Sequence, residues 1–326
     1  MTADFTLDFP VGKEIRILQV TDTQIIDSSQ CRYPTRLCET ERLLWTPENM
    51  EQRMGKYLRG AVEKSQPDVI VHTGDFSYGE FDDTGASFEK HIALMDSFER
   101  PWCLALGNHE RETQKGAAYL CEGLEKAKFG LFKGGNFVDG KRCEGDGNYS
   151  VLIRRGGQPV SLFYFLDSGV GTAENPAGVY EVQREWLKGQ AAAYQGVPAY
   201  AFFHIPLRCM AEKLKNYGYE KEGFTAYEIP ENADGDFGFV GEWGHDALYI
   251  DYDGSLKGLF EEIGVRRVFV GHIHKHAFTV KCGNLYVTHG MKTGEYDSHD
   301  KAHLGGTLLI LPKDGGEMTV ENVFVR

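Results

Sequence analysis

The sequence predicts an α/β protein built on a parallel β-sheet with helical crossovers, and three observations support this prediction. Short apolar runs alternate with longer segments in which apolar residues recur at helical spacing. The first half of the chain has the order strand, helix, strand, helix, strand, which is typical of parallel sheets. Of the 326 residues, 41% are hydrophobic and 25% are charged, which is an ordinary composition for a globular domain.

The elements of the first half follow from local sequence signals. Residues 15–20 (IRILQV) form a short apolar run of the kind that becomes a buried strand. Residues 47–65 carry Pro47 near their start and apolar side chains at helical spacing, so they predict a helix. By the same criteria, the further predicted strands are 68–74 and 102–107, and the further predicted helices are 84–98 and 113–128.

The second half of the chain is richer in strands. Gly156-Gly157 separates two apolar runs, 148–155 and 159–167, and this pattern predicts a hairpin. Helices at 180–195 and 254–263 are expected to lead into strands at 199–205 and 266–274, and the C-terminal residues are expected to form hairpins. The sequence has no evident linker or repeat, so we predict one domain over residues 1–326.

Residues 207–253 form the least regular part of the sequence, because they are rich in glycine, aspartate and aromatic residues. A long irregular stretch inside a compact domain is usually functional. We therefore expect this segment to shape a substrate pocket. Its candidate wall residues are Phe237, Phe239, Trp243 and Tyr249.

The charge balance argues against one broad class of partner. The formal net charge of −13 repels the phosphates of nucleic acids, so we expect no nucleic-acid-binding surface. The seven cysteines are odd in number and lack CxxC spacing, which favours reduced thiols. The N-terminal residues lack a signal-peptide pattern, and no apolar run approaches the roughly 18 residues that span a bilayer. We therefore expect a cytoplasmic protein with no membrane partner.

Polar residues gather at the ends of five predicted strands, which is where ligands bind in open α/β sheets. Singly, each cluster has an ordinary explanation, such as a turn or a hydrogen-bonded structural histidine. Together they predict a metal site, because each offers metal-ligand side chains and all follow strands. The clusters are Thr21-Asp22-Thr23-Gln24, Gly74-Asp75-Phe76-Ser77-Tyr78, Gly107-Asn108-His109-Glu110, His204 and Gly271-His272-Ile273-His274.

The types of ligand indicate both the metal and the chemistry. Carboxylate, imidazole and amide oxygen suit manganese, iron or zinc better than calcium. One carboxylate can bridge two metal ions. Two ions about 3.5–4 Å apart can clamp both the attacking and the leaving oxygen of a phosphoryl transfer. The ligand types are therefore compatible with a pair of metal ions of the kind that acts on phosphate esters.

The order Asp-x-Gln, Gly-Asp, Gly-Asn-His-Glu, His and Gly-His-x-His resembles that of the calcineurin-like metallophosphoesterases, from residue 15 to about residue 290. The resemblance implies a four-layer α/β/β/α sandwich of two mixed β-sheets flanked by helices. It also implies a phosphohydrolase in which a metal-held hydroxide attacks phosphorus. We expect a phosphomonoesterase. A phosphodiesterase acting on nucleotides or lipids and a non-catalytic scaffold stay open as alternatives.

The same resemblance assigns roles to the motif residues. It makes Asp75 the bridging carboxylate. It assigns Asp22 and His274 to the first metal, and Asn108, His204 and His272 to the second. It makes His109 a catalytic residue that assists the leaving oxygen, with Glu110 orienting His109. Arg111 and Arg208 follow motif residues and are further candidates for phosphate contacts.

Two residues depart from the common family pattern. Gln24 stands where the family commonly has histidine, and it could ligate the first metal or act only beside it. Tyr78 is similar to the tyrosine that binds ferric iron in the purple acid phosphatase branch, although it could equally be an ordinary packing residue. If Tyr78 is a ligand, the resemblance implies Fe(III) paired with a divalent metal. The segments Asn148-Tyr149, 165–169 and 204–207 also resemble purple-acid-phosphatase-like proteins.

Overall fold

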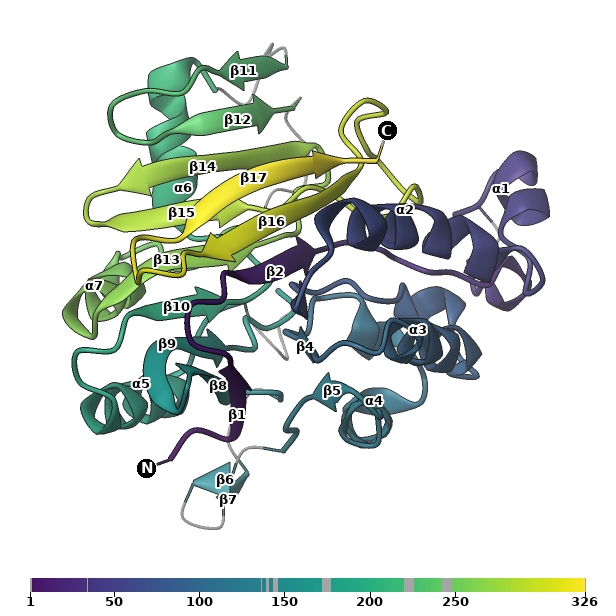
Figure 1. The fold of residues 1–326 in the computed structure, drawn as a ribbon. Coiled ribbons are helices and arrows are strands. Elements are labelled where there is room, and N and C mark those ends of the chain that lie inside the picture. Colours follow the sequence, from purple (N-terminus) through teal and green to yellow (C-terminus); the bar gives the residue numbers. More distant parts are fainter. Residues whose placement is uncertain are drawn as a thin grey trace.

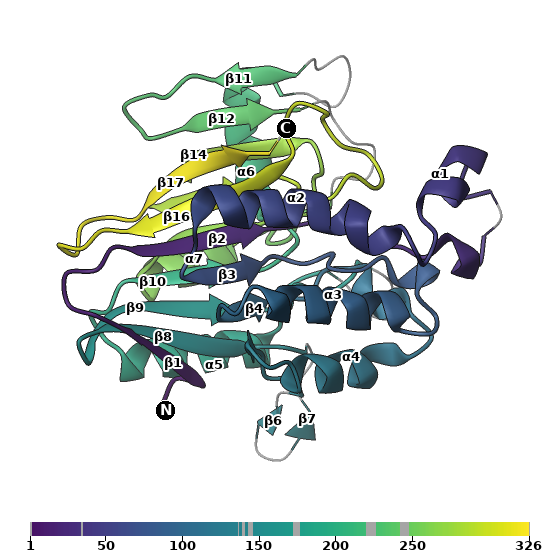
Figure 2. The ribbon, with the colours of Figure 1, turned by 45° about the vertical axis from the view of Figure 1, so that its right-hand side comes forward.

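Two large β-sheets stack on each other, and helices cover their outer faces (Figures 1 and 2). The computed structural model describes residues 2–33, 35–135, 137–138, 141–142, 146–171, 177–219, 226–241 and 248–325. Both sheets contain parallel and antiparallel pairs of strands. The expected α/β/β/α sandwich of two mixed sheets is therefore confirmed.

The six-stranded sheet contains the strands predicted in the first half of the chain. Its order is β17-β16-β2-β3-β4-β5, and the central pairs β2–β3 and β3–β4 are parallel. The strands are β2 (Ile15–Val20), β3 (Val69–His72), β4 (Trp102–Leu104), β5 (Gly130–Leu131), β16 (Gly305–Leu311) and β17 (Thr319–Phe324). The helices of this half are α1 (Glu39–Leu44), α2 (Met50–Ser65), α3 (Ala86–Ser97) and α4 (Gly116–Glu125).

The nine-stranded sheet has the order β1-β8-β9-β10-β13-β15-β14-β12-β11. Its strands are β1 (Phe5–Phe9), β8 (Tyr149–Arg155), β9 (Gln158–Phe165), β10 (Ala199–Phe202), β11 (Tyr227–Ile229), β12 (Phe237–Val240), β13 (Val265–Val270), β14 (His276–Cys282) and β15 (Leu285–His289). The associated helices are α5 (Glu181–Ala193), α6 (Arg208–Leu214) and α7 (Ser255–Glu262). A small separate ribbon consists of β6 (Phe137–Val138) and β7 (Lys141–Arg142).

Local sequence signals explain most of these elements. The buried face of α2 includes Met50, Met54 and Leu58, which recur at the spacing of one helical stripe. All four residues of β3 are buried, as expected for a central parallel strand covered on both faces. The β8–β9 hairpin turns at Gly156-Gly157, where φ is +58° and +79°, and two positive φ values suit a type I′ turn.

Residues 207–253 are more regular than we predicted. They contain α6 and the antiparallel pair β11–β12, which extends the edge of the nine-stranded sheet. The prediction missed β11 and β12 because strands of three and four residues are too short for a clear alternating pattern. Residues 220–225 and 242–247, which include Trp243, lie outside the described residues.

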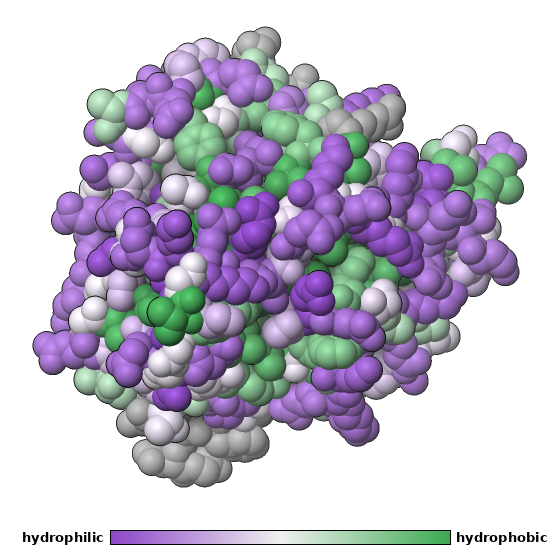
Figure 3. All heavy atoms as spheres, viewed as in Figure 1, coloured by the Kyte–Doolittle hydropathy of each residue, from purple (hydrophilic) through white to green (hydrophobic). Residues whose placement is uncertain are grey.

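The surface and the helix lengths agree with the composition. The face shown in Figure 3 is dominated by hydrophilic residues, with apolar residues in small groups between them, as expected for a face in contact with water. None of the helices in the described part of the chain is both long enough and apolar enough to cross a bilayer.

Stacked aromatic rings fill the core beneath the ends of four neighbouring strands. Tyr149, Phe165, Phe202 and Phe269 occupy paired positions on β8, β9, β10 and β13. Successive ring centroids are 4.6, 5.1 and 4.8 Å apart, and the ring planes are nearly parallel. We call these four residues the aromatic ladder. They belong to the core cluster that contains the residues of β2 and β3, so they pack between the two sheets.

The hydroxyl of Tyr149 also joins the two sheets by hydrogen bonds. It accepts from the backbone N–H of Leu104 at 2.9 Å and donates to the carbonyl oxygen of the same residue at 3.0 Å. Tyr149 lies on β8 and Leu104 on β4, and both residues are fully buried. The hydroxyl therefore satisfies two backbone groups of the other sheet.

We expect Tyr149→Phe to lower the free energy of unfolding by about 2 kcal/mol or more, because it leaves two buried backbone groups without a partner. Urea denaturation measures this change. The matched control is Tyr164→Phe, because the hydroxyl of the buried Tyr164 makes no hydrogen bond within the described residues. Equal losses in the two variants would contradict the role given to the Tyr149 hydroxyl.

Candidate metal centre

The predicted clusters meet at the carboxyl ends of the central strands, and strained backbone holds them there. Eight described non-glycine residues have positive φ, and four of them belong to these clusters. The four are Asp22 (+51°), Gln24 (+46°), Asp75 (+54°) and His272 (+78°). Each such residue costs about 1–3 kcal/mol, and such strain concentrates at functional sites.

Backbone hydrogen bonds align the loops that follow β2 and β3. The N–H of Asp22 donates to the carbonyl of Gly74 at 3.0 Å, and the N–H of Gln24 donates to that of Asp75 at 2.9 Å. Glycine is required where the loops approach each other. A Cβ atom on Gly107 would lie 2.3 Å from Oδ1 of Asp75, and one on Gly271 would lie 2.8 Å from Oδ2 of Asp22.

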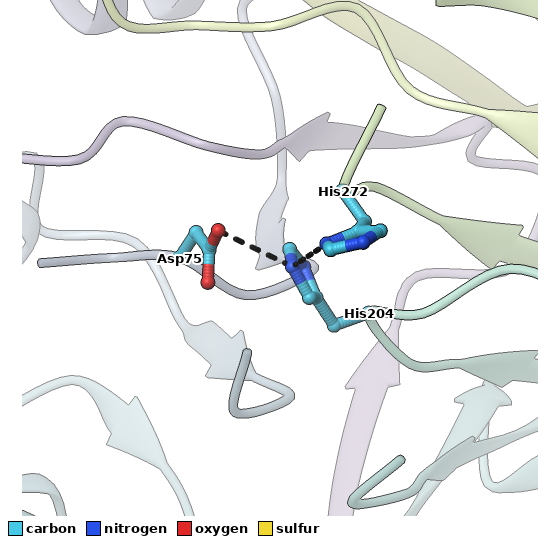
Figure 4. A group of neighbouring side chains, drawn as sticks. All are labelled: Asp75, His204 and His272. Atoms are coloured by element: carbon cyan, nitrogen blue, oxygen red, sulfur yellow. Dashed lines mark hydrogen bonds and ion pairs between the residues drawn. The ribbon is translucent and has the colours of Figure 1, made fainter. Parts of the chain in front are cut away.

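Four candidate ligands converge on the position predicted for the second metal. Nε2 of His204 lies 3.2 Å from Nδ1 of His272 and 3.3 Å from Oδ2 of Asp75 (Figure 4). It also lies 3.0 Å from Oδ1 of Asn108. Nδ1 of His204 lies 2.8 Å from the carbonyl oxygen of Thr73 and donates to it. That hydrogen bond turns Nε2 toward the centre, as outer partners of ligating histidines generally do. We call these four residues the second ligand group.

Asp22, Asp75 and His274 converge on the position predicted for the first metal. We call these three residues the first ligand group. Their ligand atoms lie within 4.8 Å of one another. Oδ2 of Asp22 accepts from Oγ1 of Thr21 at 2.7 Å and from the N–H of His272 at 3.1 Å. Oδ1 of Asp22 is buried, has no hydrogen-bond partner within the described residues, and lies 3.4 Å from Nε2 of His274. A cation at this position would satisfy that oxygen, so the group fits a metal ion.

The electrostatics of the two groups show how much negative charge is concentrated there. Burial opposes ionisation of Asp75, but His204 and His109 nevertheless hold its pKa well below the usual range. Burial would lower the pKa of His204, but Asp75 and Asp22 raise it to about 9. Burial lowers the pKa of His272 to about 3.

The comparison with known families agrees with this geometry. The model of the calcineurin-like phosphoesterase family matches residues 15–276. The chain belongs to this family. Among curated proteins of Arabidopsis thaliana, "Probable inactive purple acid phosphatase 28" is 28% identical over 259 residues, covering 71% of this chain and 58% of the relative. "Probable inactive purple acid phosphatase 14" is 24% identical over 318 residues, covering 86% and 70%.

A solved structure has the same fold. The crystal structure of a dimetal phosphatase from Danio rerio is 12% identical, with a TM-score of 0.50, and the match covers 94% of this chain and 98% of that one. At this identity the likeness shows the fold alone. The chain spans 58% of the length of the first curated relative, and that relative is named inactive.

His109 lies beside the shared Asp75, but the carboxylate next to its ring is not the one we predicted. Nδ1 of His109 lies 2.8 Å from Oε1 of Glu112, and Nε2 lies 3.9 Å from Oδ2 of Asp75. Burial would lower the pKa of His109, but Asp75 and Glu112 raise it to about 9. The ring also stacks on that of Tyr78, with centroids 3.8 Å apart.

The prediction that Glu110 orients His109 is wrong. Glu110 is fully buried and accepts from the N–H of Gly107 at 2.8 Å and from the N–H of Phe76. These two hydrogen bonds connect the loop after β3 to the loop after β4. Glu112 reaches His109 because a short 3-10 helix, Glu110–Glu112, follows the histidine directly. The spacing of three residues between His109 and Glu112 was the signal in the sequence that could have identified this pair.

Gln24 lies beside the first ligand group, but its oxygen points away from that group. Oε1 accepts from Nζ of the buried Lys292 at 2.6 Å. Nε2 of Gln24 lies 3.1 Å from Nε2 of His274 and 3.2 Å from Oδ2 of Asp75. Sequence reasoning missed Lys292, since no motif marks a lysine in the loop after β15.

The hydroxyl of Tyr78 is engaged by another cationic side chain. It accepts from Nη2 of Arg36, and burial raises the Tyr78 pKa far above its usual value. The proposed ligand roles of Gln24 and Tyr78 stay predictions. The amide oxygen of Gln24 and the hydroxyl of Tyr78 each accept a hydrogen bond from a cationic side chain.

The two arginine candidates have other partners. Arg111 pairs bidentately with Asp167, and Nη1 lies 3.1 Å from Oδ1. Arg208 lies over the rings of Tyr249 and Tyr252, at 5.9 and 5.5 Å from their centroids. Neither arginine lines the cavity at the metal centre.

A cavity of about 770 Å³ opens over the two ligand groups. Its walls come from segments far apart in the chain: Thr35, Arg36, Glu41, Tyr78, Glu80, Glu112, Val170, Leu248, Tyr296, Asp297 and Ser298. Of the described residues in 207–253, only Leu248 takes part, so Phe237, Phe239 and Tyr249 are not wall residues. Phe239 instead stacks on His303, with centroids 3.7 Å apart, and Tyr249 is buried.

Because Asp75 belongs to both ligand groups, we expect Asp75→Asn to weaken metal binding at both positions. Loss of a buried charge partner costs about 3 kcal/mol or more, which corresponds to an affinity roughly 100-fold lower. Calorimetric titration with Mn²⁺ and elemental analysis after dialysis measure the effect. The control is Asp82→Asn, because Asp82 is equally buried but caps α3 and lies outside both groups. Unchanged binding in Asp75→Asn would exclude a shared ligand.

Proposed function

We propose that the chain is a metal-dependent phosphomonoesterase that acts on small phosphate esters. One observation carries the proposal: two ligand groups share Asp75 on the floor of a cavity, and His109 lies beside that carboxylate. Divalent ions of manganese, zinc or iron, when bound there, would act as Lewis acids on a phosphate ester and on water. A volume of about 770 Å³ accommodates a small organic phosphate.

His109 is positioned to donate a proton to the leaving oxygen. The carboxylate of Glu112, with Oε1 2.8 Å from Nδ1, favours the imidazolium by its charge, so Nε2 carries a proton toward the centre. Stacking on Tyr78 fixes the plane of the ring. The backbone N–H of His109 donates to Oδ1 of Asp75 at 3.1 Å, which ties the acid to the shared carboxylate.

The names of the curated relatives support a competing proposal, a non-catalytic scaffold, since both are called inactive. Such a scaffold has no need of a histidine–glutamate pair at the centre. The described site retains that pair and the ligand-type side chains of both groups. We therefore favour the enzyme, and turnover decides between the two proposals.

We expect His109→Ala to lower turnover of p-nitrophenyl phosphate by about 10²–10⁴-fold, because a positioned general acid contributes that much. Glu112→Gln should lower it by about 10–100-fold, since Glu112 acts only through His109. Metal content should stay unchanged in both variants. The control for the glutamate is Glu122→Gln, an exposed residue of α4. Metal loss in His109→Ala would contradict the catalytic role.

Removal of the metal should abolish turnover, and added Mn²⁺ or Zn²⁺ should restore it, since the ions supply the Lewis acid. Parallel assays on p-nitrophenyl phosphate and its bis ester test the substrate class. A higher kcat/KM for the bis ester would indicate a phosphodiesterase. If neither ester is hydrolysed with manganese, zinc or iron, the result would favour the scaffold.

The orientation of the Tyr78 hydroxyl toward Arg36 leads us to expect no tyrosinate–ferric charge-transfer band in iron-loaded protein. The visible spectrum tests this. A band that disappears in Tyr78→Phe would instead establish Tyr78 as a ligand and an iron centre of the purple type.

A further inference from the structure

A buried lysine lies against the first ligand group. Lys292 follows β15 and is 1% exposed. Its Nζ donates to the carbonyl oxygen of Asp22 at 2.9 Å and to Oε1 of Gln24 at 2.6 Å. The N–H of Thr293 donates to the carbonyl of Thr21 at 2.9 Å, which fixes the two loops side by side. Lysine is almost never fully buried unless its charge has partners.

Lys292 determines which end of the Gln24 amide faces the metal position. An ammonium group only donates hydrogen bonds, so the amide atom 2.6 Å from it must be the oxygen. The NH₂ group therefore points to Nε2 of His274 at 3.1 Å and Oδ2 of Asp75 at 3.2 Å. These are lone pairs that a first metal ion would use. If the amide rotated to offer its oxygen, its NH₂ group would face the donors of Lys292.

The positive charge of Lys292 also opposes the binding of a cation at the first metal position. Burial lowers the pKa of Lys292, whereas the negative charges of Asp22, Asp297 and Asp75 act in the opposite direction and favour its ammonium form. Two carboxylates contribute to the first ligand group, and Lys292 offsets one of their charges before any cation arrives. Within the described residues, no lysine or arginine donates a hydrogen bond to a side chain of the second ligand group, where His204 instead meets oxygen atoms of Thr73 and Asn108.

We propose that Lys292 and Gln24 make the two metal positions unequal, so that a divalent cation binds at the first position at least about 10-fold more weakly than at the second. The proposal rests on the proposed function only in requiring that the chain binds metal. Under limiting metal, the chain then holds one ion, bound by Asp75, Asn108, His204 and His272.

The test is a calorimetric titration of metal-free protein with Mn²⁺, together with electron paramagnetic resonance of the bound ion. We expect one tight ion per chain with the signal of an isolated Mn²⁺. A second ion should bind at least 10-fold more weakly, with a spin-coupled signal. Both readouts are independent of turnover.

Two variants test the cause. Gln24→Glu keeps an oxygen atom within hydrogen-bond distance of Lys292. It also replaces the NH₂ group that faces His274 and Asp75 by an oxygen that can bind metal, so the affinity of the first position for Mn²⁺ should rise at least 10-fold. Lys292→Met removes the charge and frees the amide, with the same expected direction. The matched controls are Gln195→Glu and Lys313→Met, which change the same charges at exposed positions. Thermal melting checks that each variant folds.

Three outcomes would overturn the inference. Two ions of equal affinity in the unmodified protein would refute it and leave the proposed function intact. Unchanged first-position affinity in folded Gln24→Glu and Lys292→Met would refute the assigned cause. No Mn²⁺ binding at either position would overturn both this inference and the proposed function.

Discussion

The hydrogen bond from Nδ1 of His204 to the carbonyl oxygen of Thr73, at 2.8 Å, joins the two halves of the candidate centre. His204 follows β10 of the nine-stranded sheet, and Thr73 follows β3 of the six-stranded sheet. The bond orients the imidazole ring so that Nε2 faces Asp75. It is possible only because residue 74 is glycine, since a Cβ atom there would lie 2.6 Å from the same Nδ1. Together with the hydrogen bond from the N–H of His272 to Asp22, this contact fixes the ligands of one sheet relative to those of the other.

The aromatic ladder gives this junction a firm base. Phe202 lies two residues before His204, and its ring stacks between those of Phe165 and Phe269. Side chains that pack in a close-packed core have few alternative positions. The carboxyl ends of β9, β10 and β13 are therefore held in place. The loops that follow these strands and carry the site residues need to span only short distances. This is how backbone with positive φ at Asp75 and His272 can be tolerated.

The sequence was sufficient to predict the strand-end residues, because a parallel sheet brings the carboxyl ends of its strands to one edge. Asp22, Asp75 and His274 converge for this reason. It was not sufficient where a contact depends on how distant loops pack. Lys292 lies 268 positions from its partner Gln24, and no spacing rule connects them. The prediction of the cavity walls was wrong for the same reason. Arg36 and Tyr296 reach the cavity through tertiary packing, whereas Phe239 was predicted from aromatic content and stacks on His303 instead.

The division of the ligands between the sheets has a thermodynamic consequence. Asp22, Asp75 and Asn108 follow strands of one sheet, whereas His204, His272 and His274 follow strands of the other. An ion held by both sets binds only while the sheets are stacked, so it acts as a reversible cross-link between them. By mass action, free metal at 100 times its dissociation constant adds about 2.7 kcal/mol to the stability of the folded state. The availability of metal in the surroundings would thereby change the equilibrium stability of the stacked sheets.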